Sequence, residues 1–192
     1  MNARLDLVTP RDVGAIEDQF VAVYREAFSP PPYRETEDDV ARYAERFPRH
    51  AAQDGFRCAV ATDNDRLLGF AYGYFGRPGQ WWHDTVRAAL DPAVATRRLD
   101  GAFELVELAV VPPLQGQGIG GGLHDLVLAQ TPAARAVTTT AQHENPAVRF
   151  YRRRGWLPLL EDFDFPGARM TYLVLGLELC PAASADVAPA RS

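Results

Sequence analysis

The sequence predicts one mixed α/β domain, and three observations lead to that prediction. Apolar, β-branched runs of strand length alternate along the chain with segments in which apolar residues recur every three or four positions. A glycine-rich turn joins one such run, Phe103–Val111, to a helical segment that starts near Ile119. Hydrophobic residues fill 47% of the 192 positions, enough for a single substantial core. We therefore expect one domain over residues 1–180, followed by a small, polar and disordered tail over residues 181–192.

Charge and composition argue against several classes of protein. The formal net charge is −5, whereas binding to nucleic-acid phosphates requires a basic face. No window approaches the roughly 18 apolar residues of a membrane span. The two cysteines, Cys58 and Cys180, suggest neither a disulfide framework nor a metal-binding C-x-x-C pair. We therefore expect a cytoplasmic protein, monomeric or homodimeric, with no nucleic acid, membrane or metal among its partners.

The N-terminal third predicts a strand followed by two helices. Alternating residues around Leu5 and Leu7 indicate the strand. Thr9-Pro10 is a typical helix start, and the apolar period that follows predicts one helix as far as Phe28. The proline-rich loop over residues 29–33 ends it. A second helix is expected from Thr36, whose hydroxyl can cap a first turn rich in acidic residues.

A β-hairpin and a long connection are expected next. The runs Phe56–Thr62 and Arg66–Phe75 are strand-like, and Asp63-Asn64-Asp65 between them is typical of a tight turn. The connection over residues 76–100 is too long for another tight hairpin and is interpreted as an insertion. Its adjacent tryptophans, Trp81 and Trp82, either anchor the insertion to the core or form a lid over a substrate.

The glycine-rich turn has the layout of an anion-binding site. The strand before it ends at Pro112-Pro113, and Gln115–Gly120 leads into the next helix. The first N–H groups of a helix lack partners, its dipole favours negative charge, and glycines let a phosphate approach the backbone. Gly116-x-Gly118-x-x-Gly121 also satisfies a dinucleotide-binding pattern. That alternative is less favoured, because the four residues Pro112–Gln115 separate the first glycine from the strand and the next strand ends in threonines.

The remaining segments complete the sheet. Arg135–Ala141 is a short strand, and Asn145-Pro146 starts the next helix. Trp156–Asp162 and Met170–Leu179 are expected to form a final antiparallel pair.

Two motifs in this order resemble the GNAT N-acetyltransferase superfamily. Gln115–Gly120 fits the signature Q/R-x-x-G-x-G/A. Asn145–Trp156 is similar to a second segment of that superfamily, which carries F/L-Y-x-x-x-G-F/W. The resemblance covers roughly residues 3–179. It implies a mixed, mostly antiparallel sheet of six to seven strands that splays between the fourth and fifth and is flanked by about four helices.

The resemblance also implies acetyl-CoA as cosubstrate and assigns residues to it. The backbone of the fourth strand would pair with the pantetheine arm, and the turn would hold the pyrophosphate. The coenzyme-binding residues implied in this way are Leu108, Ala109, Val110, Gln115, Gly116, Gln117, Gly118, Ile119, Gly120, Gly121 and Asn145.

Direct transfer of an acetyl group to an amine requires an oxyanion donor, an acid and a base. By resemblance, Tyr151 is the acid that protonates the thiolate. Glu107 and Glu104 are candidate bases, and a water relay is an equally common alternative. Three positions apart, the two carboxylates face opposite sides of a regular strand unless a bulge resets the alternation. We favour Glu107, beside the donor backbone, although Glu104 matches a position that some members use; His143 is a loop alternative.

The acceptor is the least determined partner. A primary amine of a small molecule, an antibiotic or an amino acid, or of a peptide, is compatible with the sequence. Aromatic residues expected on the acceptor side favour an apolar or cationic small molecule, and the predicted substrate-binding residues are Tyr33, Tyr74, Trp81 and Trp82. A non-catalytic acyl-CoA-binding module is the alternative, and the presence of both Tyr151 and Glu107 favours an enzyme.

Overall fold

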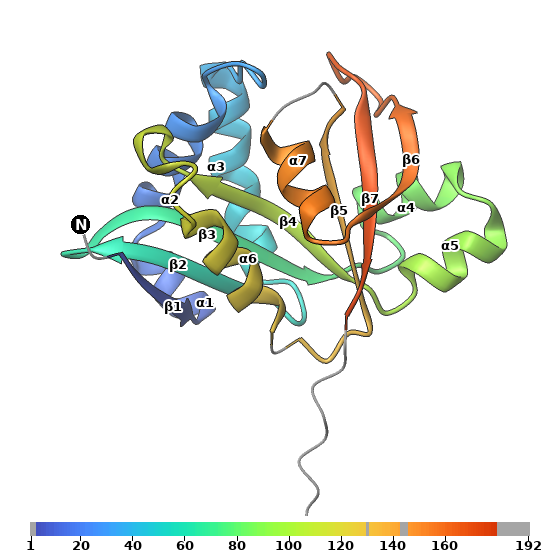
Figure 1. Cartoon of the computed structure of the whole chain (residues 1–192), viewed down its shortest axis with the longest axis horizontal. Coiled ribbons are helices and arrows are strands. Elements are labelled where there is room, and N and C mark those ends of the chain that lie inside the picture. Colours follow the sequence, from blue (N-terminus) through green and yellow to red (C-terminus); the bar gives the residue numbers. More distant parts are fainter. Residues whose placement is uncertain (1–2, 130, 143–145, 180–192) are drawn as a thin grey trace, which may run out of the picture.

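The computed structural model describes residues 3–129, 131–142 and 146–179, and the predictions for Asn145, His143 and residues 181–192 lie outside them. The central element is one sheet with the strand order β1-β2-β3-β4-β5-β7-β6 (Figure 1). The strands are β1 (Arg4–Val8), β2 (Arg57–Asp63), β3 (Arg66–Phe75), β4 (Phe103–Val110), β5 (Arg135–Ala141), β6 (Leu157–Phe163) and β7 (Tyr172–Glu178).

Strand directions confirm the predicted mixed and mostly antiparallel sheet. Among the described residues, β4 and β5 form the parallel pair, and the other neighbouring strands run antiparallel. The hairpin of β2 and β3 turns at Asn64 and Asp65, which both have positive φ, as a two-residue turn between twisted strands requires.

The described residues contain more helices than the four or so expected. They are α1 (Pro10–Ala15), α2 (Glu17–Phe28), α3 (Glu37–Ala51), α4 (Trp81–Ala89), α5 (Pro92–Leu99), α6 (Ile119–Leu128) and α7 (Pro146–Arg153), with a 3-10 turn over Pro112–Leu114. The helix expected from Pro10 to Phe28 is broken at Ile16, whose φ of −129° is not helical. The connection over residues 76–100 contains two helices, α4 and α5. The second begins at Pro92 because the Asp91 carboxylate accepts hydrogen bonds from the backbone N–H groups of Ala93 and Val94.

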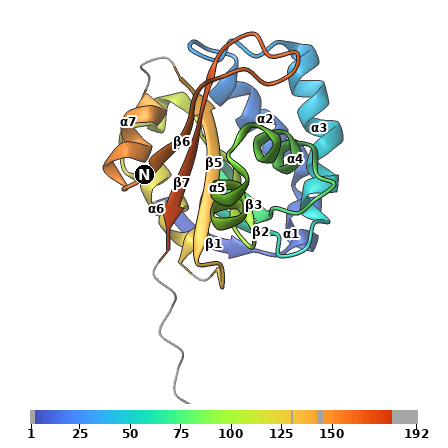
Figure 2. The same cartoon turned by 90° about the vertical axis from the view of Figure 1, so that its right-hand side faces the viewer.

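The helices form layers on the two faces of the sheet (Figure 2). Helices α6 and α7 cover one face, and α2 and α3 cover the other. On the second face the rings of Phe20, Phe47 and Phe70 meet, with Phe20 lying 4.8 Å from each of the other two. This packing fixes α3 against the middle of the sheet.

None of the helices in the described residues is long and apolar enough to cross a membrane.

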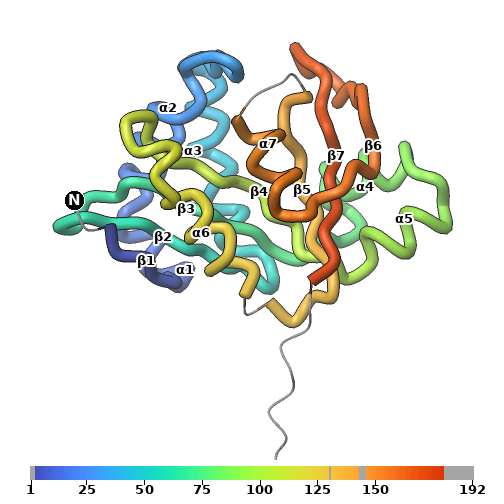
Figure 3. Tube along the Cα trace, in the orientation of Figure 1, coloured from blue at the N-terminus to red at the C-terminus, as the bar shows by residue number. Residues whose placement is uncertain are grey.

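Strands β4 and β5 separate soon after they meet, as predicted. Their ladder contains the pairs Phe103–Ala136 and Glu104–Val137, and the strands then diverge (Figures 1 and 3). At the point of divergence the Thr138 hydroxyl donates to the Leu105 carbonyl at 2.8 Å. Beyond that bond, the edge of β4 is free of β5, which creates a gap in the middle of the sheet.

A bulge in β4 changes which way its carboxylates face. Tyr72 pairs with Glu107 and Gly73 pairs with Leu105, so Val106 is an extra residue in the ladder. The strands come very close here, since a Cβ on Gly73 would overlap the Glu104 carbonyl oxygen. The bulge resets the alternation, which is the exception that allows Glu104 and Glu107 to face the same side.

Replacement of Gly73 by alanine should destabilise the fold, because the Cβ would force two backbones apart. We expect the free energy of unfolding to fall by about 1–3 kcal/mol, as in other overpacked sites. Urea denaturation measures the loss. Gly76→Ala is the matched control, because its Cβ would lie at least 3.5 Å from its neighbours. Equal midpoints for the two variants would contradict a steric need for glycine at position 73.

Candidate active site

Two cavities lie on either side of β4. The first, about 300 Å³, is called here the turn cavity, and the second, about 480 Å³, the carboxylate cavity. Consecutive residues of β4 divide between them, since Leu108 lines the turn cavity and Glu107 the carboxylate cavity. The free segment of β4 therefore borders both cavities.

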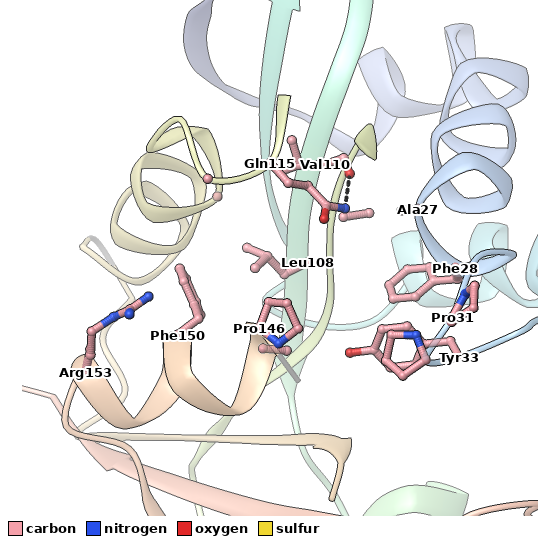
Figure 4. A pocket seen from close by; sticks show the side chains of 15 residues that line it. Ala27, Phe28, Pro31, Tyr33, Leu108, Val110, Gln115, Pro146, Phe150 and Arg153 are labelled. Atoms are coloured by element: carbon pink, nitrogen blue, oxygen red, sulfur yellow. Dashed lines mark hydrogen bonds between the residues drawn. The ribbon is translucent and has the colours of Figure 1, made fainter. Parts of the chain in front are cut away.

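The turn cavity lies between α7 and the loop that follows α2 (Figure 4). Figure 4 shows Phe150 and Arg153 on one side and Phe28 and Tyr33 on the other, with Leu108 between them. The lining residues are Ala27, Phe28, Pro31, Pro32, Tyr33, Leu108, Ala109, Val110, Gln115, Gly116, Gly120, Pro146, Ala147, Phe150 and Arg153. A cationic end and apolar walls suit an extended ligand with an anionic group.

The backbone geometry of the turn suits an anion. Gly116 and Gly118 have φ of 76° and 89°, which side-chain-bearing residues rarely adopt. The side-chain amide of Gln115 donates to the Val110 carbonyl at 2.9 Å (dashed in Figure 4). The side-chain amide of Gln117 donates to the Pro113 carbonyl at 3.0 Å. In the described part of the chain, no hydrogen bond is donated by the N–H groups from Gly116 to Gly120. These donors at the start of α6 are available to a phosphate.

The carboxylate cavity contains one buried acid, Glu104, and one partly buried acid, Glu107. It is lined by Arg46, His50, Tyr74, Gln80, Trp81, Trp82, Glu104, Leu105, Val106, Glu107, Thr138 and Thr139. Glu104 is 4% exposed, its Oε2 has no hydrogen-bond partner among the described residues, and burial raises its pKa to about 8. Burial also raises the pKa of Glu107 to about 7, although Arg46 at 3.2 Å opposes the shift.

Helix α3 supplies two side chains that the sequence analysis missed. Arg46 donates to both Glu107 and the Tyr24 hydroxyl. Burial lowers the pKa of Arg46, but Glu107 and nearby tyrosines more than reverse that effect, so the guanidinium stays charged. His50 lies 3.1 Å from the Tyr72 hydroxyl, and burial, with help from Arg46, lowers its pKa to about 4. At neutral pH the cavity thus contains one fixed cation and a neutral imidazole.

The two tryptophans of α4 have different environments. Trp82 donates its indole N–H to the Thr139 hydroxyl at 2.8 Å and packs on a small core around Val86 and Leu99. Trp81 is 60% exposed, and its ring contacts Phe165. The anchor role therefore suits Trp82, whereas Trp81 lies at the rim of the carboxylate cavity.

Tyr151 is buried between the cavities. It is 5% exposed and is not among the described residues that line either cavity. Its ring packs against Trp156, and burial raises its pKa while the neighbouring Thr138 opposes the shift. Because Thr138 lines the carboxylate cavity, Tyr151 lies beside that space.

The structure groups most of the predicted site residues. The turn cavity includes the predicted coenzyme-binding residues Leu108, Ala109, Val110, Gln115, Gly116 and Gly120; Gln117, Gly118, Ile119 and Gly121 belong to the same turn and helix start. The carboxylate cavity includes Glu104, Glu107, Tyr74, Trp81 and Trp82. Tyr33, predicted to bind the acceptor with the last three, lies in the turn cavity instead, where its hydroxyl is 3.5 Å from that of Thr140.

Two residues of the site carry a recognisable signal in the sequence. Arg46 and His50 interrupt the apolar stripe of α3 that includes Tyr43 and Phe47, and a charge within such a stripe indicates a buried partner. Arg153 gives no comparable signal, because α7 is rich in arginine throughout. No group of His, Cys, Asp and Glu that could hold a metal ion occurs in the described residues.

Solved structures share this architecture. PaiA N-acetyltransferase of Thermoplasma acidophilum, solved with coenzyme A, superposes with a TM-score of 0.63 at 13% identity, over 93% of this chain and all of that one. YncA of Salmonella typhimurium, solved with acetyl-CoA, gives 0.57 at 16% identity, over 98% of this chain and all of that one. The chain thus shares its fold with these two acetyltransferases.

Sequence comparison identifies the family. Residues 16–156 match the model of the acetyltransferase (GNAT) family, so the chain belongs to that family. A GCN5-like protein acetyltransferase of Mycobacterium tuberculosis is 36% identical over 129 residues. That match covers 63% of this chain and 63% of the relative's length.

Replacement of each tryptophan by alanine should separate the two roles. Trp82→Ala removes a hydrogen bond and core packing, so we expect a loss of about 2 kcal/mol or more in the free energy of unfolding. Trp81→Ala should change stability by about 0.5 kcal/mol or less but raise the acceptor KM. Urea denaturation and steady-state kinetics measure the two effects. Equal losses of stability would show that Trp81 is also an anchor.

Proposed function

We propose that the protein transfers the acetyl group of acetyl-CoA to a primary amine by direct attack within a ternary complex. The observation that supports this proposal most is the placement of a turn with free N–H groups and a pair of cavity-lining carboxylates on opposite sides of one strand segment. The coenzyme would occupy the turn cavity and the amine the carboxylate cavity. Crystallisation of two structural relatives with coenzyme A or acetyl-CoA supports the choice of cosubstrate.

Coenzyme binding would use the backbone more than side chains. The free N–H groups of Gly116–Gly120 would hold the pyrophosphate, with Arg153 adding positive charge. The free edge at Leu108–Val110 would pair with the pantetheine amides, and Asn145 is proposed to contact the same arm. This arrangement would direct the thioester toward the point where the two cavities meet.

The base is better assigned to Glu104 than to Glu107. Glu107 is held by Arg46, whereas Glu104 lines the cavity and has no ion pair among the described residues. Glu104 would take one proton from the ammonium group, the neutral nitrogen would then bond to the thioester carbon, and the second proton would leave the nitrogen to water. The N–H of Leu108 would donate to the oxyanion that forms. Glu107 and Arg46 would position the amine.

Collapse of the tetrahedral intermediate breaks the carbon–sulfur bond and leaves a thiolate. Tyr151 is proposed to donate its proton to that sulfur, as its family position implies. Its raised pKa keeps the hydroxyl protonated at neutral pH, which a proton donor requires. A non-catalytic acyl-CoA-binding module would have no use for the costly burial of Glu104, so an enzyme is the better proposal.

The acceptor can be a small molecule or a protein. The relative from Mycobacterium tuberculosis is described as a protein acetyltransferase, which favours an amine on a polypeptide. The exposed Trp81 at the cavity rim supports either a peptide or a free aromatic amine. We further propose a single domain over residues 1–180 with an insertion over residues 76–100, in a cytoplasmic monomer or homodimer.

Gly120→Ala should weaken coenzyme binding without harming the fold. A Cβ on Gly120 would lie 3.7 Å from Val110 and enter the lining of the turn cavity, where it would keep a phosphate from the backbone. We expect the Kd for coenzyme A in calorimetry to rise by about tenfold or more. Gly14→Ala in α1, where a Cβ meets no neighbour, is the control. Unchanged affinity would remove the turn from the proposed site.

Glu104→Gln and Tyr151→Phe should affect different parts of the pH profile. A base acts when ionised, so kcat of the parent should rise with pH up to about 8, and Glu104→Gln should abolish this rise. Tyr151→Phe should keep the rise but lower kcat by about a hundredfold or more. Assays of thiol release between pH 6 and 9 measure kcat for the parent and both variants. A parent-like rate for Tyr151→Phe would show a packing role only.

A further inference from the structure

The charged groups around the carboxylate cavity are few. Its lining contains the acids Glu104 and Glu107, the cation Arg46 and the imidazole of His50, which is neutral at pH 7. Two acids therefore face one permanent cation. A ligand that brings one positive charge and no negative charge balances the cavity when both acids are ionised.

Glu104 is the carboxylate with which a cationic ligand would pair. It is 4% exposed, and its Oε2 accepts no hydrogen bond among the described residues. A buried carboxylate without a donor is costly, and an ammonium group beside it lowers that cost. Oε2 is itself closed to solvent, so a ligand in the cavity would meet the other carboxylate oxygen of Glu104.

A ligand carboxylate would find no equivalent partner. The guanidinium of Arg46 already binds Glu107 at 3.2 Å and the Tyr24 hydroxyl at 3.3 Å. It also lies 5.4 Å from the centre of the Tyr43 ring. Both bonds use the same Arg46 nitrogen, Nη2, so a third acid would share one cation with Glu107 in a space where like charges repel strongly.

Aromatic groups occupy the rest of the wall. Tyr74 and the two tryptophans line the cavity with Glu104. Such rings favour an organic cation through both apolar contact and their negative faces. The lining thus suits an ammonium group on an apolar carbon chain or ring.

From these contacts we infer that the acceptor is an alkyl or arylalkyl primary amine with no carboxylate beside the amino group. Glu104 binds its ammonium group before the proton is lost, and α-amino acids are excluded. This inference rests on the proposed function for its chemistry but concerns the cavity itself. The amine can belong to a free small molecule or to a lysine side chain, since both present the same group.

Matched acceptors test the effect of one carboxylate. Phenethylamine, phenylalanine and phenylalaninamide share the aromatic ring, and the amide adds bulk without charge. We expect kcat/KM for phenethylamine and phenylalaninamide to exceed that for phenylalanine by about tenfold or more. Tryptamine and tryptophan repeat the comparison. Equal values, or a preference for the amino acids, would overturn the inference.

Calorimetry separates this inference from the proposed function. Coenzyme A is titrated into the protein first, and failure to bind would contradict the proposed function. Phenethylamine and phenylalanine are then titrated into the protein with and without coenzyme A. Tighter binding of phenethylamine supports the inference even without turnover, whereas equal binding or no binding of either contradicts it.

A charge-matched pair of variants tests the role of Glu104. Glu104→Gln and Glu45→Gln each remove one carboxylate, but Glu45 is exposed on α3. Phenethylamine affinity should fall by about tenfold in Glu104→Gln and stay unchanged in Glu45→Gln. Circular dichroism verifies that both variants fold. Unchanged affinity in a folded Glu104→Gln variant would overturn the assignment of the ammonium group to Glu104.

A blocked peptide distinguishes the two sources of the amine. N-acetyl-glycyl-lysyl-glycinamide has no charged group except its lysine ammonium. The enzyme itself contains no lysine, so any acetyl-lysine found by mass spectrometry comes from the peptide. Transfer to the peptide at a rate above that to phenethylamine identifies a protein side chain as the source, and the reverse order identifies a free amine.

Discussion

The early end of the ladder between β4 and β5 is the constraint on which the rest of the site depends. After the pair Glu104–Val137 the strands no longer exchange backbone hydrogen bonds, and Thr138 bridges to Leu105 through its side chain. The open segment of β4 then borders both cavities. A continuous sheet would have filled this gap with β5 and left no backbone for a ligand to pair with.

The bulge at Val106 adds a second constraint, because it places two carboxylates in one buried space. Burial alone would favour their neutral forms. Arg46 offsets part of that cost for Glu107, and nothing among the described residues does so for Glu104. The protein therefore keeps an unfavourable group where the proposed reaction needs a proton acceptor, while the aromatic core around Phe20 supports the fold elsewhere.

Local signals in the sequence predicted most of the fold. The turn at Asn64-Asp65, the cap at Thr36 and the proline stop after β4 depend on neighbouring residues, and each was found where expected. The bulge in β4 depends on Gly73 in another strand, and the partner of Glu107 comes from α3, so neither could be found from local pattern. The break at Ile16 was also missed, because the apolar period continues across it.

The first turn of α6 has a further consequence. Gly120, Gly121 and Gly122 each cost a helix roughly 1 kcal/mol relative to alanine. A Cβ at either of the last two would meet only the flexible ends of the Arg154 and Leu5 side chains, so packing alone does not require glycine there. This turn is therefore among the segments that open with the least free energy. Hydrogen exchange of its backbone amides should slow when a bound phosphate accepts their hydrogen bonds. The exchange rate of this turn would therefore measure how much of the protein has ligand bound.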